Sequence, residues 1–328
     1  MTGSVLLLVS LAAPCGTRSA EALPSHFVYF GRDHERLTDS SFLTHPRIMG
    51  AQVTFTWREL EPERDQYDFA AIRDQVRLLG QYDKRLFLQI TDVTFSERPP
   101  VPRYLLSDTA FHGGAARKHE GDSGVFDGWV ARRWDPAVRV RFARLLEALA
   151  QEFDGSIEGM NLPETAIGFE SPRFHPPGFS FDAYASGVLE MLRSAREAFT
   201  RSCVIVYANF MPGERRPAQD RGYLRGIYEL AGEIGAGVGG PDLLPYREGQ
   251  QVNSLPLIAA RSAGVVAGMA VQDGNLADLD PATGRPVTVQ TLYRFATEVL
   301  HLDYIFWGIE EPYFSRDVLP FLMELPPA

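Results

Sequence analysis

The chain has 328 residues, of which 45% are hydrophobic, with a formal net charge of −10 and a pI near 5.3. This length is enough for one barrel-sized domain or two smaller ones. The acidic balance argues against a nucleic acid or an anionic membrane as a partner. With only two cysteines, a zinc site built from cysteine ligands is excluded.

The N-terminus has the pattern of an export signal. Residues 5–13 form an apolar core, and Ala20-Glu21-Ala22 places small residues around a cleavage point. The apolar run is too short to span a bilayer, and no later stretch approaches about 20 apolar residues. We predict a signal peptide over residues 1–22, a single domain over residues 23–328, and export to the periplasm or the medium. A misassigned start codon or a short anchor is the alternative.

From residue 26 onward, short β-rich runs alternate with polar loops and with segments of helical periodicity. The eight predicted strands are residues 26–30, 50–57, 85–91, 157–161, 204–209, 236–240, 265–272 and 304–307. The predicted helices are residues 69–82, 136–153, 181–199, 221–232, 255–263 and 287–300. Such alternation indicates parallel βαβ units, and eight units close a (β/α)8 barrel, or TIM barrel. An open doubly wound sheet is the alternative, but the glycine-rich phosphate loop typical of it is absent from the sequence.

Local signals mark some of the boundaries. Asp135-Pro136 predicts a helix cap followed by proline at the first helical position, and Asp154-Gly155 predicts the end of the same helix. Ser180 and Asp182 are the two candidate caps of the next long helix. Between the third strand and its helix, residues 92–133 form a long loop rich in Pro, Gly and charge. Loops of this length are usually functional or disordered, and on a barrel this one leaves the C-terminal face.

Polar and aromatic residues gather at the predicted C-terminal ends of the strands, where barrel enzymes carry their chemistry. In strand order these are Arg32; Trp57 and Glu59; Asp92; Asn161 and Glu164; Tyr207 and Asn209; Asp242; Gln272 and Asp273; and Trp307, Glu310 and Glu311. Because the strand bodies are apolar, the pattern predicts a substrate-binding site at the barrel mouth, although loops are polar in most proteins. Trp57, Tyr207 and Trp307 either offer faces on which a sugar ring stacks or belong to the core.

Cleavage of a sugar bond needs two facing carboxyl groups, one to protonate the leaving oxygen and one to attack the anomeric carbon or activate water. We predict Glu164 as the acid, because Asn161 and the apolar strand before it provide a partly dry setting that raises the pKa. Asp273, at the tip of the seventh strand, is the predicted partner. The alternatives for this second carboxylate are Asp92, Asp242, and Glu310 or Glu311. A separation of ~5–5.5 Å predicts retention of configuration, and ~6.5–9.5 Å predicts inversion.

Other chemistries find little support. The seven histidines show no His-Glu-x-x-His spacing, and Gly-x-Ser-x-Gly is absent from the sequence. We therefore predict no metal and no cofactor. The run Gly237-Val238-Gly239-Gly240 does not open a helix as a phosphate-binding turn would, and it predicts a close approach of two backbones at a strand end.

Two segments resemble the clan A glycoside hydrolases. Residues 50–57 (GAQVTFTW), with Leu60-Glu61-Pro62-Glu63 and Tyr67-Asp68-Phe69 after them, resemble the second-strand signature of that clan. Residues 134–161 resemble the helix that leads into its fourth strand. The resemblance covers about a third of the chain. It implies a TIM barrel, a carbohydrate substrate, an acid/base Glu after the fourth strand and a nucleophilic Glu at the tip of the seventh.

The chain departs from that pattern at both catalytic positions. In the clan the acid/base Glu usually follows directly on an asparagine, whereas Leu162-Pro163 separates Asn161 from Glu164 here. The seventh tip reads Val271-Gln272-Asp273-Gly274, without a Glu. We predict a glycosidase, retaining if the carboxyl spacing is short, that acts on an oligo- or polysaccharide through Glu164 and Asp273. The alternatives are a carbohydrate-binding barrel that has lost its nucleophile, and a metal-assisted or lyase-like barrel enzyme.

Overall fold

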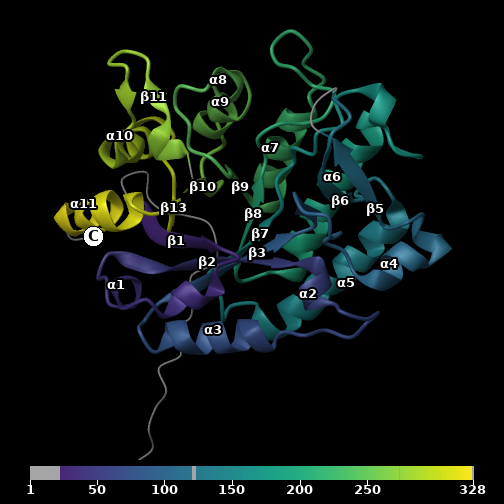
Figure 1. The fold of residues 1–328 in the computed structure, drawn as a ribbon, viewed down its shortest axis with the longest axis horizontal. Helices are drawn as coiled ribbons and strands as arrows, with labels where there is room; N and C mark the ends of the chain where they lie inside the picture. Colours follow the sequence, from purple (N-terminus) through teal and green to yellow (C-terminus); the bar gives the residue numbers. More distant parts are fainter. Residues whose placement is uncertain (1–22, 120–122, 273, 327–328) are drawn as a thin grey trace, which may run out of the picture.

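The computed structural model describes residues 23–119, 123–272 and 274–326 (Figure 1). Eight parallel strands close into a barrel, because the last strand pairs with both its neighbour and the first strand. In spatial order they are β1 (Ser25–Gly31), β2 (Ile48–Thr56), β3 (Arg85–Thr91), β7 (Gly159–Leu162), β8 (Cys203–Tyr207), β9 (Gly237–Gly240), β10 (Ala267–Val271) and β13 (Tyr304–Gly308). The predicted (β/α)8 barrel is confirmed, and the open sheet is excluded. The predicted signal peptide and Asp273 lie outside the described residues.

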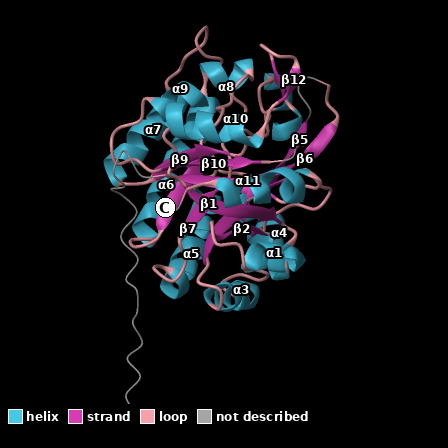
Figure 2. Ribbon diagram, turned by 90° about the vertical axis from the view of Figure 1, so that its left-hand side faces the viewer, coloured by secondary structure: helices cyan, strands magenta, loops and turns pink. Residues whose placement is uncertain are grey.

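Helices surround the strands, as the two perpendicular views show (Figures 1 and 2). They are α1 (Ser40–Leu43), α2 (Trp57–Leu60), α3 (Ala70–Gly80), α4 (Arg103–Ser107), α5 (Pro136–Phe153), α6 (Phe181–Ala198), α7 (Tyr223–Ile234), α8 (Glu248–Val252), α9 (Ser254–Ala259), α10 (Val289–Arg294) and α11 (Leu319–Glu324). A π-helical turn, Phe295–Val299, continues α10. In the described part of the chain, no helix is both long enough and apolar enough to cross a membrane.

The two longest helices begin where the capping signals predicted. The Asp135 carboxylate accepts a hydrogen bond from the backbone N–H of Ala137 at 2.9 Å, which satisfies one of the free donors at the start of α5. The Ser180 hydroxyl accepts one from Ala183 at 3.1 Å, so Ser180 and not Asp182 caps α6. These caps set where each helix starts and therefore where the preceding loop ends.

Alternate strand positions fill the inside of the barrel. Phe27, Phe87 and Phe306 form the centre of a buried cluster, with ring centroids 5.0–5.9 Å apart. Ile205 and Tyr207 of β8 belong to the same cluster. A second and larger cluster joins the outer faces of the strands to the helices. The inside of the barrel is therefore a packed core.

The described part of the segment between β3 and α5 contains helix and strand, where the sequence predicted a long loop. It carries α4 and a three-stranded antiparallel sheet of β4 (Val93–Thr94), β6 (Phe126–Ala131) and β5 (Ala115–His119), with β6 in the middle. Because β4 follows directly on β3, this sheet stands at the C-terminal end of the barrel. A small hairpin of β11 (Leu279–Asp280) and β12 (Arg285–Pro286) follows β10.

The glycine run of β9 lies against β10, as predicted. Gly239 pairs in register with Gly268. A Cβ atom on Gly239 would lie 1.8 Å from the carbonyl oxygen of Gly268, a distance that no side chain tolerates. Glycine at this position is therefore a packing requirement of the barrel wall.

Candidate active site

Glu164 lies at the C-terminal end of the barrel, two residues beyond β7, and its side chain is half-buried. Asn209, two residues beyond β8, donates a hydrogen bond from Nδ2 to Glu164 Oε2 at 3.0 Å. The backbone of Glu164 is also held, because Arg133 Nη1 donates to its carbonyl oxygen at 2.7 Å. Side chain and backbone are thus fixed from two neighbouring parts of the barrel.

The environment of Glu164 favours its protonated form. Burial raises the pKa of the carboxyl group above its ordinary value, and the negative charge of Asp242 raises it further. The hydrogen bond from Asn209 and the positive charges of Lys118 and Arg133 lower it without reversing the shift. A carboxyl group in this condition keeps its proton closer to neutral pH and can serve as a general acid.

The phenol of Tyr29 is influenced by three carboxylates at the C-terminal end of the barrel. Tyr29 lies near the end of β1 and packs against the cluster inside the barrel. Burial raises the pKa of Tyr29 against the opposing influence of Thr54, and the charges of Glu310, Asp242 and Glu164 raise it further. These three carboxylates follow β13, β9 and β7, whose C-terminal ends lie at the same end of the closed barrel. Sequence analysis did not single out Tyr29, because a tyrosine inside a strand is ordinarily part of the core.

Asp242 is fixed by a bridge between two loops. Its Oδ1 accepts a hydrogen bond from Asn275 Nδ2 at 3.1 Å, and burial raises the pKa of its carboxyl group. Asn275 Oδ1 in turn accepts the backbone N–H groups of Leu243 and Gln272. The side chain of Gln272 donates to the carbonyl oxygen of Pro241 at 2.8 Å. Asn275 and Gln272 therefore tie the loop after β9 to the loop after β10, and Gln272 supports the site instead of pointing freely into it.

The other predicted carboxylates follow β10 and β13. Asp273 lies outside the described residues, so its role stays a prediction. The Glu310 carboxylate folds back over the end of β13, where a Cβ atom on Gly308 would lie 2.0 Å from Oε2. Glu311 is engaged elsewhere, because its carboxylate accepts a hydrogen bond from the Ser315 hydroxyl at 2.7 Å. Of the strand-eight pair, Glu310 is the one that belongs to the mouth.

Asp92 forms a buried ion pair in place of the predicted substrate contact. Its two oxygens accept hydrogen bonds from Arg133 at 2.6 and 3.0 Å, and the two side chains are 1% and 2% exposed. Arg133 also donates to the hydroxyl of Tyr184, which donates to the carbonyl oxygen of Thr165. The prediction that Asp92 binds substrate is wrong for this conformation, since its carboxylate is enclosed. It supports the loop that carries Glu164.

The three aromatic residues that were candidates for sugar stacking all lie in the core. Trp57 and Trp307 are fully buried, and their indole N–H groups donate to Glu61 at 2.8 Å and to His26 at 3.2 Å. Tyr207 is 1% exposed and packs inside the barrel. Of the two alternatives left open for these rings, the structure therefore supports the core for all three, because protein atoms enclose both faces of each ring.

Asn161 is the next-to-last residue of β7, near the C-terminal end of the strand, and it is fully buried. Burial raises the pKa of the neighbouring Tyr207, and the amides of Gln52 and Asn161 lower it in part. Gln52 donates to the Tyr207 hydroxyl at 2.9 Å, whereas the Asn161 amide makes no hydrogen bond of acceptable geometry with a described residue. A buried amide without partners is costly, so this site is suited to an ordered water. Because Asn161 is as enclosed as Asp92, the structure gives it no contact with a substrate at the mouth.

Lys118 reaches the mouth from β5, although sequence analysis missed it. Its ammonium group is buried, 3.6 Å from the Asp127 carboxylate and 3.8 Å from the centre of the Phe95 ring. Burial lowers the pKa of Lys118, and the charges of Asp127 and Glu164 raise it only in part. The residue stands in a segment predicted as a loop, and only the pairing of β5 with β6 brings it beside Glu164.

Arg32 and Glu59 form an ion pair above the ends of β1 and β2. Arg32 Nη2 lies 2.6 Å from Glu59 Oε1. Glu59 Oε2 also accepts the backbone N–H of Thr56 at 2.7 Å, and the Thr56 hydroxyl accepts the N–H of Glu59, which completes a capping box at α2. The pair therefore has a structural role, and it lines a separate pocket that also contains Arg58, Arg98 and Arg103.

The structure thus brings together four of the residues that the sequence predicted: Glu164, Asn209, Asp242 and Glu310. Around them it adds Tyr29, Lys118 and Asn275. Among the described residues, no group of three or more His, Cys, Asp or Glu side chains is arranged to hold a metal ion. The arrangement can supply one protonated carboxyl group and further carboxylates to a substrate at the mouth.

Comparison with known proteins defines the class of fold. No family model and no curated protein matches the sequence. The catalytic domain of β-amylase from Paenibacillus polymyxa is similar over 88% of this chain and 93% of that chain, with a TM-score of 0.57 and 8% sequence identity. A GH10 endoxylanase from a sugarcane soil metagenome is similar over 87% and 86%, with a TM-score of 0.50 and 14% identity. At these identities the likeness shows the fold alone, and the chain has the TIM-barrel fold of these glycoside hydrolases.

Proposed function

We propose that the protein is a glycoside hydrolase that cleaves O-glycosidic bonds of an oligo- or polysaccharide, with Glu164 as its general acid. The observation that carries the proposal is a half-buried Glu164 after the fourth barrel strand, with its pKa raised and two further carboxylates around the same mouth. The fold shared with a β-amylase and an endoxylanase supports it. Export, which rests on residues 1–22 alone, is part of the proposal, since polysaccharides are met outside the cell.

In this reaction Glu164 gives its proton to the leaving glycosidic oxygen. A second carboxylate on the other side of the sugar attacks the anomeric carbon, or activates the water that does so. The Asn209 amide holds Glu164 in one orientation and stabilises the carboxylate that remains after proton transfer. Arg133 keeps the loop in place through the carbonyl oxygen of Glu164.

We propose Asp273 as the second carboxylate, with Glu310 and Asp242 as alternatives. This group has to be ionised to act as a nucleophile or a base. Burial raises the pKa of Asp242, which opposes that role and makes Glu310 the stronger of the two described alternatives. In Asp273→Ala, Glu310→Ala and Asp242→Ala, loss of turnover that azide restores identifies a nucleophile, because azide is a small external nucleophile that fills the space left by the removed carboxylate.

The substitution Glu164→Gln tests the proposal, because it keeps the shape of the side chain and removes the proton. Turnover of an unactivated glycan, measured as released reducing ends, should fall by about 10²–10⁴-fold. Turnover of a dinitrophenyl glycoside should fall far less, since that leaving group needs no proton. Glu190→Gln, on the outer face of α6, is the matched control and should keep full activity. If Glu164→Gln cleaves the unactivated glycan within about tenfold of the wild type, Glu164 is not the acid.

Sugar binding without cleavage is the second candidate function. It is favoured by the tip of β10, where Gln272-Asp273-Gly274 stands and the clan A resemblance implies a Glu. Under this alternative, calorimetry detects binding of a glycan to the wild type while chromatography finds no product. If the wild type forms product and the Glu164→Gln variant does not, this alternative is excluded.

A further inference from the structure

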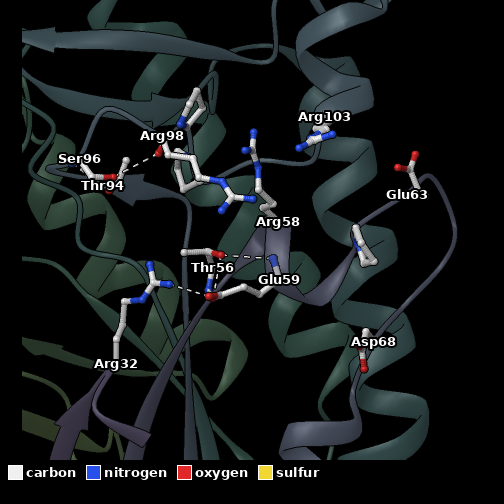
Figure 3. Close-up of a pocket in the computed structure, with 13 residues that line it drawn as sticks. Arg32, Thr56, Arg58, Glu59, Glu63, Asp68, Thr94, Ser96, Arg98 and Arg103 are labelled. Carbon is white, nitrogen blue, oxygen red and sulfur yellow. Dashed lines mark hydrogen bonds and ion pairs between the residues drawn. The ribbon is translucent and has the colours of Figure 1, made fainter.

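Four arginines line one pocket at the C-terminal end of the barrel, in a chain whose net charge is −10. The pocket has a volume of about 360 Å³ and lies among the segments that follow β1, β2 and β3 (Figure 3). Arg32 follows β1, Arg58 lies in α2, and Arg98 and Arg103 belong to the insertion after β3. Three carboxylates, Glu59, Glu63 and Asp68, line the same pocket, so its lining has a small net positive charge on an acidic protein.

Only Arg32 is matched by a carboxylate, at 2.6 Å from Glu59. Among the described residues, Arg58, Arg98 and Arg103 have no carboxylate within ion-pair distance. Figure 3 shows the side chains of Arg58, Arg98 and Arg103 extending toward one another. Two more acidic residues, Glu63 and Asp68, lie on the other side of the pocket in this view. The pocket therefore contains carboxylates, but none of the described ones lies within ion-pair distance of these three guanidinium groups.

Arg58 is held rigidly in this space. Its backbone N–H donates to the carbonyl oxygen of Pro100, and its Nε donates to that of Val101, both at 2.8 Å. Burial lowers the pKa of Arg58, and the positive charges of Arg98 and Arg103 lower it further. The Nη groups of Arg58 form no hydrogen bond with a described residue. A bound anion would relieve the repulsion and use these donors.

The pocket lies next to the candidate active site. Thr94 and Ser96 line the pocket, and Phe95 between them packs under the ammonium group of Lys118. Lys118 in turn lies close enough to Glu164 for the two charges to shift each other's pKa. The pocket and the candidate active site therefore both lie at the C-terminal end of the barrel, with residues 94–96 and Lys118 between them.

We propose that this pocket binds an acidic group on the glycan, a carboxylate or a sulfate ester carried by a sugar ring. The proposal rests on the proposed function, which places a glycan in the adjoining mouth. Guanidinium groups match such oxyanions with paired N–H donors, and the volume is within the range of small-ligand sites. The net charge of −10 disfavours a long polyanion, which leaves a locally acidic sugar as the fitting ligand.

The test is calorimetry with three probes: methyl β-glucuronide, glucose 6-sulfate and neutral methyl β-glucoside. We expect an acidic probe to bind at least about tenfold more tightly than the glucoside, the order of one charge-assisted hydrogen bond. Arg98→Gln and Arg103→Gln should each weaken the binding of the acidic probe by about tenfold. Both side chains are exposed and make no described hydrogen bond, so these variants should fold normally. Arg193→Gln, exposed on α6, removes the same charge and should bind like the wild type.

Equal affinity for acidic and neutral probes, or unchanged affinity in both arginine variants, would overturn the proposal. A preference between the glucuronide and the sulfate tells which acidic group the pocket takes. The variant Glu164→Gln should bind the preferred acidic probe as the wild type does. If the wild type cleaves glycans through Glu164 but binds no acidic probe, only the acidic subsite fails. If it binds the acidic probe and cleaves nothing, only the hydrolase function fails.

Discussion

At the scale of single residues, two neighbours of Glu164 act on its proton in opposite directions. Asn209 stabilises the ionised carboxylate by a 3.0 Å hydrogen bond and so lowers a pKa that burial has raised. Asp242 stabilises the neutral form by its negative charge. The balance between them sets the pH at which Glu164 loses the proton that a general acid needs.

This balance gives a prediction with a definite sign. Asn209→Ala should raise the pKa of Glu164, so that the alkaline limb of the pH profile of kcat/KM moves to higher pH. Asp242→Asn should lower that pKa and move the limb to lower pH. The pH dependence of kcat/KM reports the free enzyme and is the measurement. Shifts in the same direction, or a limb that does not move in either variant, would show that another group titrates.

Single residues also show where sequence reasoning fails. Trp307 was a candidate because it ends a strand, yet its register opposite Val28 places it against the helices. Successive side chains in a strand point to opposite faces, so a displacement of one position decides between barrel interior and outer layer. The sequence defines a strand end only to within a few residues, which is too coarse for that decision. The uncertainty does not affect Glu164, because this residue lies in the loop beyond the strand.

At the scale of elements, the packing of β9 on β10 depends on Gly239. Gly239→Ala would place a methyl group against the Gly268 carbonyl oxygen and force the strands apart, at a cost of about 1–3 kcal/mol of unfolding free energy. Gly80→Ala is the matched control, since a Cβ there meets nothing within 4 Å in α3 and should stabilise by up to about 1 kcal/mol. Denaturant unfolding measures both. A Gly239→Ala protein as stable as the wild type would contradict the close approach.

The insertion between β3 and α5 is the element that the sequence predicted least well. Its strand β5 reads Ala-Ala-Arg-Lys-His, short and charged, with no alternation that predicts a half-buried strand. It forms a hairpin with β6, the next strand along the chain, and this pairing gives it order. The insertion nevertheless supplies Lys118 to the mouth and two arginines to the proposed acidic subsite.

At the scale of the whole molecule, the Asp92–Arg133 pair joins the end of β3, the loop that carries Glu164 and, through Tyr184, helix α6. Arg133→Met leaves the buried Asp92 charge without its partner and should cost about 3–5 kcal/mol of unfolding free energy. The double variant Asp92→Leu with Arg133→Met removes both charges and should cost less than the two single substitutions combined. Denaturant unfolding of the three variants measures this coupling.

The exposed ion pair Arg73–Glu152 is the control for this comparison of single and double variants. Its charges are 2.8 Å apart but remain in water, so Arg73→Met should change stability little. Additive costs at Asp92 and Arg133 would show that the pair does not act as a unit. A stable Arg133→Met variant with reduced kcat and unchanged KM would assign Arg133 a positioning role alone.

The eight alternating βα units, the caps of the two longest helices, and the polar strand ends with Glu164, Asn209, Asp242 and Glu310 could all be predicted from the sequence. These follow from periodicity and from turn and cap chemistry, which act between residues close in the chain. Tertiary structure alone decided which tips face one another and which aromatic rings are enclosed. It also brought Tyr29, Lys118 and the arginine pocket to the mouth. Burial and charge depend on neighbours from other strands, because a closed barrel brings eight distant chain segments to one end.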